Sequence, residues 1–235
     1  MSASLVFENV DAYYGTSQIL HGVSFEVLGG TVTCLLGLNG MGKTTTLRTA
    51  MGLVDRQEGR IILDGKELKG ATYVRSKMGI TLVPEDRKVF AGLTVLENLE
   101  VARCKRDQAK DFTIDDAIAI FPRLGERLKQ KAGTMSGGEQ QMLVVARAML
   151  ANPGYMMLDE PTEGLAPEYV DAIKISIDAA RSKGIGVILV EQSLPLALAV
   201  GDSFNVMQNG QIYKRFTRDE VIRDPTSLAN LLVIE

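Results

Sequence analysis

The sequence predicts an α/β protein built on a mostly parallel sheet, and two observations support this prediction. Short apolar runs rich in β-branched residues alternate with segments of helical periodicity, which is the order of a parallel α/β sheet. Several runs end in a glycine, a proline or a carboxylate, at the strand ends where open α/β sheets bind ligands. The expected strands are VTCLLG (32–37), GRIILDG (59–65), MGITLVP (78–84), YMMLDE (155–160) and GVILVE (186–191).

Length and composition exclude several classes of protein. With 235 residues, 46% of them hydrophobic, the chain can bury a sizeable core. A net charge of -3 gives no basic face, so we expect no nucleic-acid partner. The two cysteines, Cys34 and Cys104, indicate a reduced setting, and we expect neither to be catalytic.

We expect no segment of this sequence to target or anchor the chain by itself. The N-terminal stretch MSASLVFENVDAYY has no basic residue before its short apolar patch, so we expect no secretory signal. No apolar run approaches the roughly 18 to 20 residues that a membrane helix needs. Any membrane role is therefore expected to come through a partner.

The middle of the chain changes from strand to helix patterns. Between about residues 86 and 135 we expect a helical subdomain inserted into a single domain covering 1–235, on the periodicity of 94–106 and 113–131. The segment 135–154 predicts a further helix that stops at Pro153 and Gly154. An Asn-Gly turn within 203–216 predicts a two-stranded hairpin. No internal repeat is visible, so we expect one set of nucleotide-site residues per chain.

The stretch GLNGMGKT (37–44) fits the phosphate-binding pattern G-x-x-x-x-G-K-[ST] between a strand and a helix. Glycines let the backbone wrap round an anion, and the helix N-terminus attracts phosphate. We expect Lys43 to reach the β- and γ-phosphates and the Thr44 hydroxyl to bind Mg²⁺. The alternative is a glycine-rich turn without a ligand. The expected nucleotide-binding residues here are Gly37, Asn39, Gly40, Gly42, Lys43, Thr44 and Thr45.

Two carboxylates end the apolar run YMMLDEP (155–161). We expect Asp159 to hold the magnesium shell and Glu160 to act as the general base toward the attacking water. Acidic residues often end strands, so this pair alone is weak evidence. Together with the loop at 37–44 it becomes strong evidence for nucleotide hydrolysis.

The segment MSGGEQQ (135–141) resembles the signature of ATP-binding cassette proteins, at the start of the helix that precedes the Asp159 strand. A serine and two small residues at a helix N-terminus also make a second anion site, whereas the simple alternative is a helix cap. The resemblance implies contact with the nucleotide of an opposite subunit, through Ser136, Gly137, Gly138 and Glu139.

Other landmarks of this family can be matched to single positions. Tyr14 matches the aromatic residue that stacks on adenine, with Tyr13 as the alternative, and either residue could be an ordinary strand aromatic. Where the family usually has a glutamine and a histidine, this chain has Glu85 and Gln192, and Ala166 replaces a common aspartate.

These departures change the expected chemistry. An ionised Glu85 only accepts hydrogen bonds, so we expect it to face Mg²⁺ or water rather than phosphate. Gln192 can donate its amide hydrogen to the γ-phosphate but does not titrate near neutrality as histidine does. The segments PEDRKVF, SGGEQQML, EGLAP and VEQ resemble the ATPases of branched-chain amino acid importers and of their urea and amide relatives. Since that branch carries the same replacements, we read them as tuning, although they could also mark a slow site.

Two further features have weaker functional readings. His21 is the only histidine, so we expect a turn or strand role and no histidine-based metal site. In the family, the region after the Glu85 loop receives a short helix of the membrane subunit, and plain core packing is the alternative. The residues concerned are Val89, Phe90, Leu93, Val95 and Leu96.

The resemblance implies a P-loop NTPase with a RecA-like core, an N-terminal antiparallel β subdomain and an inserted helical subdomain. We expect an ATP-hydrolysing importer subunit, peripheral on the cytoplasmic side of the plasma membrane, with Mg²⁺ and ATP as cofactors. Its expected partners are a second ATPase subunit, of the same or a related chain, transmembrane permeases and, indirectly, a periplasmic or surface binding protein. The rivals are a soluble cassette ATPase and a nucleotide-gated adaptor that does not hydrolyse ATP.

Overall fold

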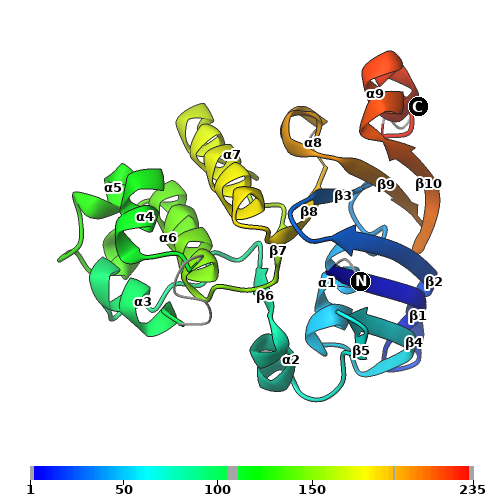
Figure 1. The fold of residues 1–235 in the computed structure, drawn as a ribbon, viewed down its shortest axis with the longest axis horizontal. Helices are drawn as coiled ribbons and strands as arrows, with labels where there is room; N and C mark the ends of the chain where they lie inside the picture. Colours follow the sequence, from blue (N-terminus) through cyan, green and yellow to red (C-terminus); the bar gives the residue numbers. More distant parts are fainter. Residues whose placement is uncertain (1–2, 105–110, 193, 233–235) are drawn as a thin grey trace.

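The structure is a computed structural model that describes residues 3–104, 111–192 and 194–232. It contains two sheets, and a group of helices drawn in green and yellow lies to the left of them in Figure 1, while other helices lie below and to the upper right. The two halves of the larger helical region come from different parts of the chain, before and after the strand β7 (Tyr155–Asp159). No helix within the described ranges is both long and apolar enough to cross a membrane.

A six-stranded sheet forms the centre of the molecule, in the order β10-β9-β3-β8-β7-β6. Neighbouring strands run parallel except at the β9–β10 edge, which is antiparallel. The strands are β3 (Val32–Leu36), β6 (Ile80–Val83), β7, β8 (Gly186–Glu191), β9 (Ser203–Gln208) and β10 (Gln211–Thr217). The parallel sheet is therefore confirmed, and so is the hairpin, whose turn residues Asn209 and Gly210 both have positive φ.

A second, antiparallel sheet has the order β2-β1-β4-β5. Its strands are β1 (Ser4–Tyr14), β2 (Ser17–Leu28), β4 (Arg56–Leu63) and β5 (Lys66–Glu67). The run 59–65, predicted beside four strands of the parallel sheet, contributes instead to β4 in this sheet. Both kinds of strand can carry an apolar run, so the sequence pattern does not tell which sheet a strand joins.

Helices cover the central sheet on both faces. The phosphate-loop helix α1 (Lys43–Met51) and α2 (Thr72–Met78) precede β6. Five helical segments lie between β6 and β7: α3 (Val95–Ala102), α4 (Ile114–Ile120), α5 (Pro122–Gly125), the 3₁₀ turn η1 (Ala132–Thr134) and α6 (Gly137–Leu150). The later helices are α7 (Pro167–Ser182), α8 (Leu194–Val200), α9 (Arg218–Arg223) and α10 (Pro225–Ala229). The expected helix at 135–154 is thus α6, and residues 105 and 106 of the segment 94–106 lie outside the described residues.

Alternation along the buried strands creates two cores. Cys34 and Leu36 of β3 face the core that contains α6, α7 and α8. Leu35, between them, faces the core that joins α1 to the antiparallel sheet. This period of two places the carboxyl ends of the strands between two layers, where the chain must turn outward.

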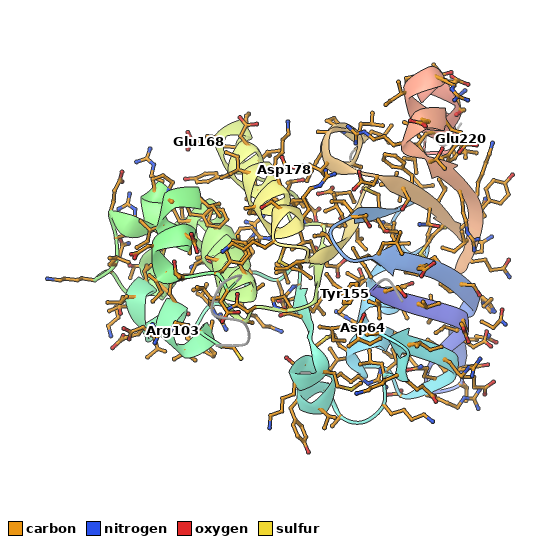
Figure 2. The ribbon with its side chains drawn as sticks, viewed as in Figure 1. Asp64, Arg103, Tyr155, Glu168, Asp178 and Glu220 are labelled. Atoms are coloured by element: carbon orange, nitrogen blue, oxygen red, sulfur yellow. The ribbon has the colours of Figure 1, made fainter. Side chains whose placement is uncertain are left out.

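A hydrogen bond joins the two sheets below the site. Tyr155, 1% exposed at the start of β7, donates to Asp64 Oδ1 at 3.2 Å, and Figure 2 shows the two side chains as neighbours. Burial and the nearby Asp64 carboxylate raise the pKa of Tyr155, so its hydroxyl stays protonated and can donate. The contact ties β7 to the turn that follows β4.

Arg75 of α2 holds the C-terminal end of α1. Its side chain donates to the carbonyls of Thr49 and Ala50, at 2.8 and 3.0 Å, and to Gly70 O at 2.9 Å. The last carbonyls of a helix have no partner within the helix, and the Arg75 guanidinium supplies a hydrogen-bond donor to them. Arg75 is itself buried, with 8% of its surface exposed. Since α1 begins at Lys43, this contact also fixes the helix that presents the phosphate loop.

We predict that Arg75→Ala lowers the free energy of unfolding by about 2 to 4 kcal/mol, because buried carbonyls lose a charged donor. Urea denaturation followed by circular dichroism measures the loss. Lys77→Ala, at an exposed position of the same helix, is the control and should change stability by less than about 0.5 kcal/mol. Equal midpoints for the two variants would show that Arg75 does not stabilise α1.

Candidate nucleotide-binding and hydrolysis site

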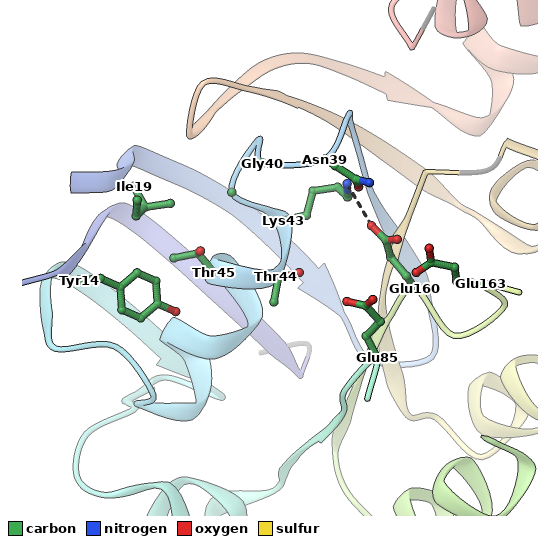
Figure 3. Close-up of a pocket in the computed structure, with 11 residues that line it drawn as sticks. Tyr14, Ile19, Asn39, Gly40, Lys43, Thr44, Thr45, Glu85, Glu160 and Glu163 are labelled. Atoms are coloured by element: carbon green, nitrogen blue, oxygen red, sulfur yellow. Dashed lines mark ion pairs between the residues drawn. The ribbon is translucent and has the colours of Figure 1, made fainter. Parts of the chain in front are cut away.

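The loops that follow β3, β6 and β7 surround a cavity of about 400 Å³. Figure 3 shows the side chains that point into it, from α1 on one side and the carboxylate-bearing loops on the other. This volume is within the range of small-molecule sites. The lining residues are Tyr14, Ile19, Asn39, Gly40, Gly42, Lys43, Thr44, Thr45, Glu85, Glu160 and Glu163.

The backbone before α1 needs its glycines. Gly42, the N-cap of α1, has φ 99°, and a Cβ there would lie 2.9 Å from Leu20 Cδ2. A Cβ at Gly37 would lie 2.6 Å from the carbonyl oxygen of Met207, so this turn passes close to β9. Larger residues at either position would push the loop away from its neighbours.

Lys43 is buried with its ammonium among three oxygens. Its Nζ donates to Gly37 O at 2.8 Å and to Leu38 O at 3.1 Å, and it lies 3.2 Å from Glu160 Oε1. An ammonium group has three hydrogens, and these contacts match that number. Lys43, the first residue of α1, is thereby held against Glu160, the carboxylate that the sequence predicts to be the base.

Asp159, at the end of β7, lies beside Thr44, at the start of α1. The Thr44 hydroxyl donates to Asp159 Oδ1 at 3.1 Å. Burial of Asp159, aided by the charges of Glu160 and Glu85 and opposed by Thr44, raises its pKa to about 6. A hydroxyl and a carboxylate oxygen are ligands that suit Mg²⁺, so the donor set fits the expected ion.

The protein offers few ligands for a metal ion at this site. Within the described ranges no group of three or more His, Cys, Asp or Glu side chains could hold a metal. Mg²⁺ in phosphate-transferring sites commonly uses one or two carboxylates and completes its shell with phosphate and water. Thr44 and Asp159 fit this pattern, whereas Glu85 lines the cavity as an exposed side chain.

Glu160 occupies a constrained backbone position. Its φ is 45°, which is uncommon for a residue with a side chain, and its N–H donates to Val190 O of β8 at 3.0 Å. The adjacent strand therefore fixes where its carboxylate points. Such constrained residues occur preferentially at functional sites.

Glu163 is a cavity residue that the sequence reading missed. Burial raises its pKa, and so do the charges of Glu160 and Glu85 and a hydrogen bond with Glu85, whereas Arg87 lowers it. The one sequence signal for Glu163 is its spacing of three residues from Glu160. In the structure this spacing closes a turn, in which Glu163 N–H donates to Glu160 O at 3.2 Å. Ile19, the other missed lining residue, has no chemical signal in the sequence.

The two candidate adenine-stacking tyrosines differ in their surroundings. Tyr14 lines the cavity, and its buried hydroxyl has no hydrogen-bond partner among the described residues. The ring of Tyr13 is covered by the Arg56 guanidinium, 3.7 Å from its centroid. Tyr14 is therefore the better placed of the two.

Gln192 lies in an adjoining cavity rather than around Lys43. That second cavity shares Glu160 and Glu163 with the first, so Gln192 stands on the far side of the two carboxylates. Its neighbour Glu191 is buried and accepts a hydrogen bond from Thr162 Oγ1 at 2.7 Å. The end of β8 is thus joined to the turn after Glu160.

The signature residues lie apart from this cavity. None of residues 136–139 is among those that line the space around Lys43. Ser136 caps α6 by accepting from Glu139 N–H at 3.3 Å, and Glu139 accepts in return from Ser136 N–H at 2.9 Å. The Glu139 carboxylate also lies 2.6 Å from Arg127 Nε, so it faces its own chain rather than the surface.

Electrostatics support this inward position of Glu139. Burial alone would raise its pKa, but the hydrogen bonds from Ser136 and the charge of Arg127 outweigh burial, and the net pKa is lowered. The carboxylate is therefore ionised at neutral pH and stabilises the first turn of α6. Of the four signature candidates, the two with side chains, Ser136 and Glu139, already bond to each other in the first turn of α6.

The residues expected to meet a helix of the membrane subunit differ in how far they are buried. Phe90 is 44% exposed, while Val95 is fully buried in the core, so only the first could meet a partner. Val89, Leu93 and Leu96 are partly buried. His21 is exposed on β2, and its backbone N–H donates to Gly210 O, so the position joins the hairpin to the antiparallel sheet through the main chain.

Comparison with known sequences finds relatives along nearly the whole chain. The high-affinity branched-chain amino acid transport ATP-binding protein BraG of Pseudomonas aeruginosa is 42% identical, over 94% of this chain and 96% of the relative. The probable branched-chain amino acid transport ATP-binding protein LivF of Archaeoglobus fulgidus is 36% identical, over 91% and 92%. The lipopolysaccharide export system ATP-binding protein LptB of Escherichia coli is 32% identical, over 94% of each chain.

Solved structures have the same fold. An ATP-binding subunit of an ABC transporter superposes with a TM-score of 0.82 at 26% identity, covering 98% of this chain and 95% of the other. A bacterial Atm1-family ABC exporter with ATP bound gives 0.81 at 26% identity, with this whole chain covering 43% of the exporter chain. The family model for the ABC transporter matches residues 20–163. The chain therefore belongs to the ABC transporter family, as one of its ATP-binding, ATP-hydrolysing subunits.

Proposed function

We propose that this chain hydrolyses Mg²⁺·ATP to energise the import of branched-chain amino acids or related small polar compounds. The observation that carries the hydrolytic part is the placement of Glu160 beside Lys43, with Thr44 and Asp159 in contact next to them. The importer part is supported by what the relatives BraG and LivF are named for. The similarity to LptB, named for export, makes the direction of transport part of the proposal.

Each residue has a distinct task in this proposal. The amides of the 37–42 loop and Lys43 bind the phosphates, and Tyr14 receives the adenine. Thr44 and Asp159, with Glu85 beside them, hold Mg²⁺, which would neutralise charge on the β- and γ-phosphates. Glu160 accepts a proton from the attacking water while the water oxygen bonds to the γ-phosphorus, and the bond from that phosphorus to the bridging oxygen breaks to release ADP.

Phosphate binding also gives Lys43 a new partner. In the structure its ammonium contacts Glu160, and a γ-phosphate near Lys43 would compete with this contact. Release from Lys43 leaves the Glu160 carboxylate free to accept a proton from water. Arrival of the substrate and activation of the base are thus linked through one ion pair.

The site is completed by a second subunit in this proposal. Residues 136–138 of one chain would cover the γ-phosphate bound to the other, which agrees with their absence from the lining of the cavity around Lys43. The partner is a second copy or a related ATPase. Transmembrane permeases bind the pair on the cytoplasmic side of the membrane, with the exposed Phe90 as a candidate contact.

We predict that Glu160→Gln lowers ATP turnover by about 100-fold or more, because the amide cannot accept the proton. Phosphate release by the purified chain measures turnover. Binding of a fluorescent ATP analogue should stay within about threefold of the parent, since glutamine keeps the size of the side chain. Turnover at the parental rate would rule out Glu160 as the base.

We predict that the parental turnover per chain rises with protein concentration, because two copies build each site. The measurement is phosphate release over a dilution series, with Glu160→Gln at every concentration to subtract contaminating activity. A constant rate per chain would contradict reversible self-assembly. Absence of turnover at every concentration would contradict self-sufficiency and support the non-hydrolysing adaptor or an obligatory related partner.

We predict that Gln192→Ala lowers turnover by about tenfold, because one hydrogen bond to the γ-phosphate in the transition state is lost. Steady-state kinetics should show the change mainly in kcat. Ser182→Ala, an exposed position on α7 remote from both cavities, is the matched control. If the two variants turn over equally fast, the Gln192 amide does not act on the phosphate.

A further inference from the structure

Arg87 lies where three functional segments of one chain meet. Its Nη2 donates to the carbonyl of Glu163, in the turn after Glu160. Its Nη1 lies 2.7 Å from where a Cβ on Gly137 would stand, so the guanidinium rests directly on the first residue of α6. Arg87 itself belongs to the loop after β6, two residues beyond Glu85, and has φ 47°.

We infer that Arg87 is a positioning residue that couples the chain's own ATP site to its signature segment, residues 136–138. One planar group contacts the Glu160 turn with one nitrogen and α6 with the other, so a shift of either is passed to the second. The inference rests on the proposed function, in which those two segments serve different ATP molecules. It adds a physical path between them within a single chain.

The glycine at 137 is part of this arrangement. An alanine there would place its methyl group against the Arg87 guanidinium and drive the two apart. On the other side of α6, a Cβ at Gly138 would lie 2.5 Å from Cε2 of Tyr169 in α7. The start of α6 thus lies between Arg87 and Tyr169, which leave no room for a side chain at position 137 or 138.

A second arginine fixes the far end of the same loop to the same helix. Arg147, in the last turn of α6, donates to Lys88 O at 2.9 Å and lies over the Phe90 ring, 4.2 Å from its centroid. Asn98 of α3, fully buried, accepts from Phe90 N–H at 3.0 Å and donates to Phe90 O at 3.1 Å. Because both ends are tied, the loop carrying Glu85 moves with α6 rather than independently of it.

The geometry requires arginine rather than positive charge alone. Guanidinium nitrogens are spaced in a rigid fork and can touch two groups at once, whereas a lysine offers a single ammonium. Lys88, the next residue, carries the same charge but is exposed and pairs only with the side chain of Asp86 among the described residues, at 2.5 Å. It is therefore a matched control at the neighbouring position.

Hydrogen–deuterium exchange tests the coupling. Saturating Mg²⁺ and the non-hydrolysable analogue AMP-PNP are added to the chain, diluted until sedimentation shows single copies. We expect exchange to slow by about tenfold in peptides covering both 37–47 and 134–143 of the parent. In Arg87→Ala the first segment should respond as in the parent, and the second by less than about twofold.

Two further variants separate bridging from charge. Lys88→Ala should respond as the parent does in both segments. Arg87→Lys should behave as Arg87→Ala does, because its ammonium cannot touch both groups. Full recovery of the 134–143 response in Arg87→Lys would overturn bridging as the mechanism. Thermal unfolding of each variant confirms that the fold is retained.

The remaining outcomes are distinct. An unchanged 134–143 response in Arg87→Ala overturns the inference and leaves the proposed ATP site standing. The same holds if the parent responds at 37–47 but not at 134–143. A parent that responds at neither segment contradicts the proposed ATP site itself, and with it the coupling.

Discussion

The buried charge of Lys43 is the constraint on which the site depends. An ammonium removed from water is costly unless oxygens surround it, and here two carbonyls of the loop after β3 and the Glu160 carboxylate provide them. Those oxygens come from the loops after β3 and β7, two strands of the central sheet that are separated by β8. Burial of the Lys43 charge therefore requires three features together: the position of α1, the course of the 37–42 loop and the turn at Glu160.

Arginines from outside the sheet hold this arrangement in place. Arg75 donates to carbonyls in the last turn of α1, and Arg127 pairs with the Glu139 carboxylate in the first turn of α6. Arg147 of α6 donates to a carbonyl of the loop after β6. Each contact joins two separate segments of the chain, and Arg75 uses two of its guanidinium nitrogens to do so. The strand ends thus supply the reacting groups, while arginines on helices and loops set their relative positions.

The sequence predicts the parts of the site that depend on local spacing. The loop at 37–44, the carboxylates after β7 and the Asn209 turn all follow from residues close together in the chain. The sheet joined by 59–65 does not, because strand pairing is a long-range property. Nor does the place of Glu163 among the other carboxylates of the cavity, or the contact of Gly137 with Arg87, a residue fifty positions earlier.

The charges in the cavity bear on which form of ATP it can accept. Glu85, Glu160 and Glu163 converge there, and burial together with the charges of Glu160 and Glu85 raises the pKa of Glu163. Lys43 alone lines the same cavity with positive charge among the residues described. A bare triphosphate would add several negative charges to this excess, at a cost that grows as water leaves. In the proposed function, Glu85 stands where the resemblance implies a glutamine and would strengthen the dependence on a divalent cation. The nucleotide would then arrive with its charge already partly neutralised, and the extra carboxylate would become a favourable neighbour of the ion.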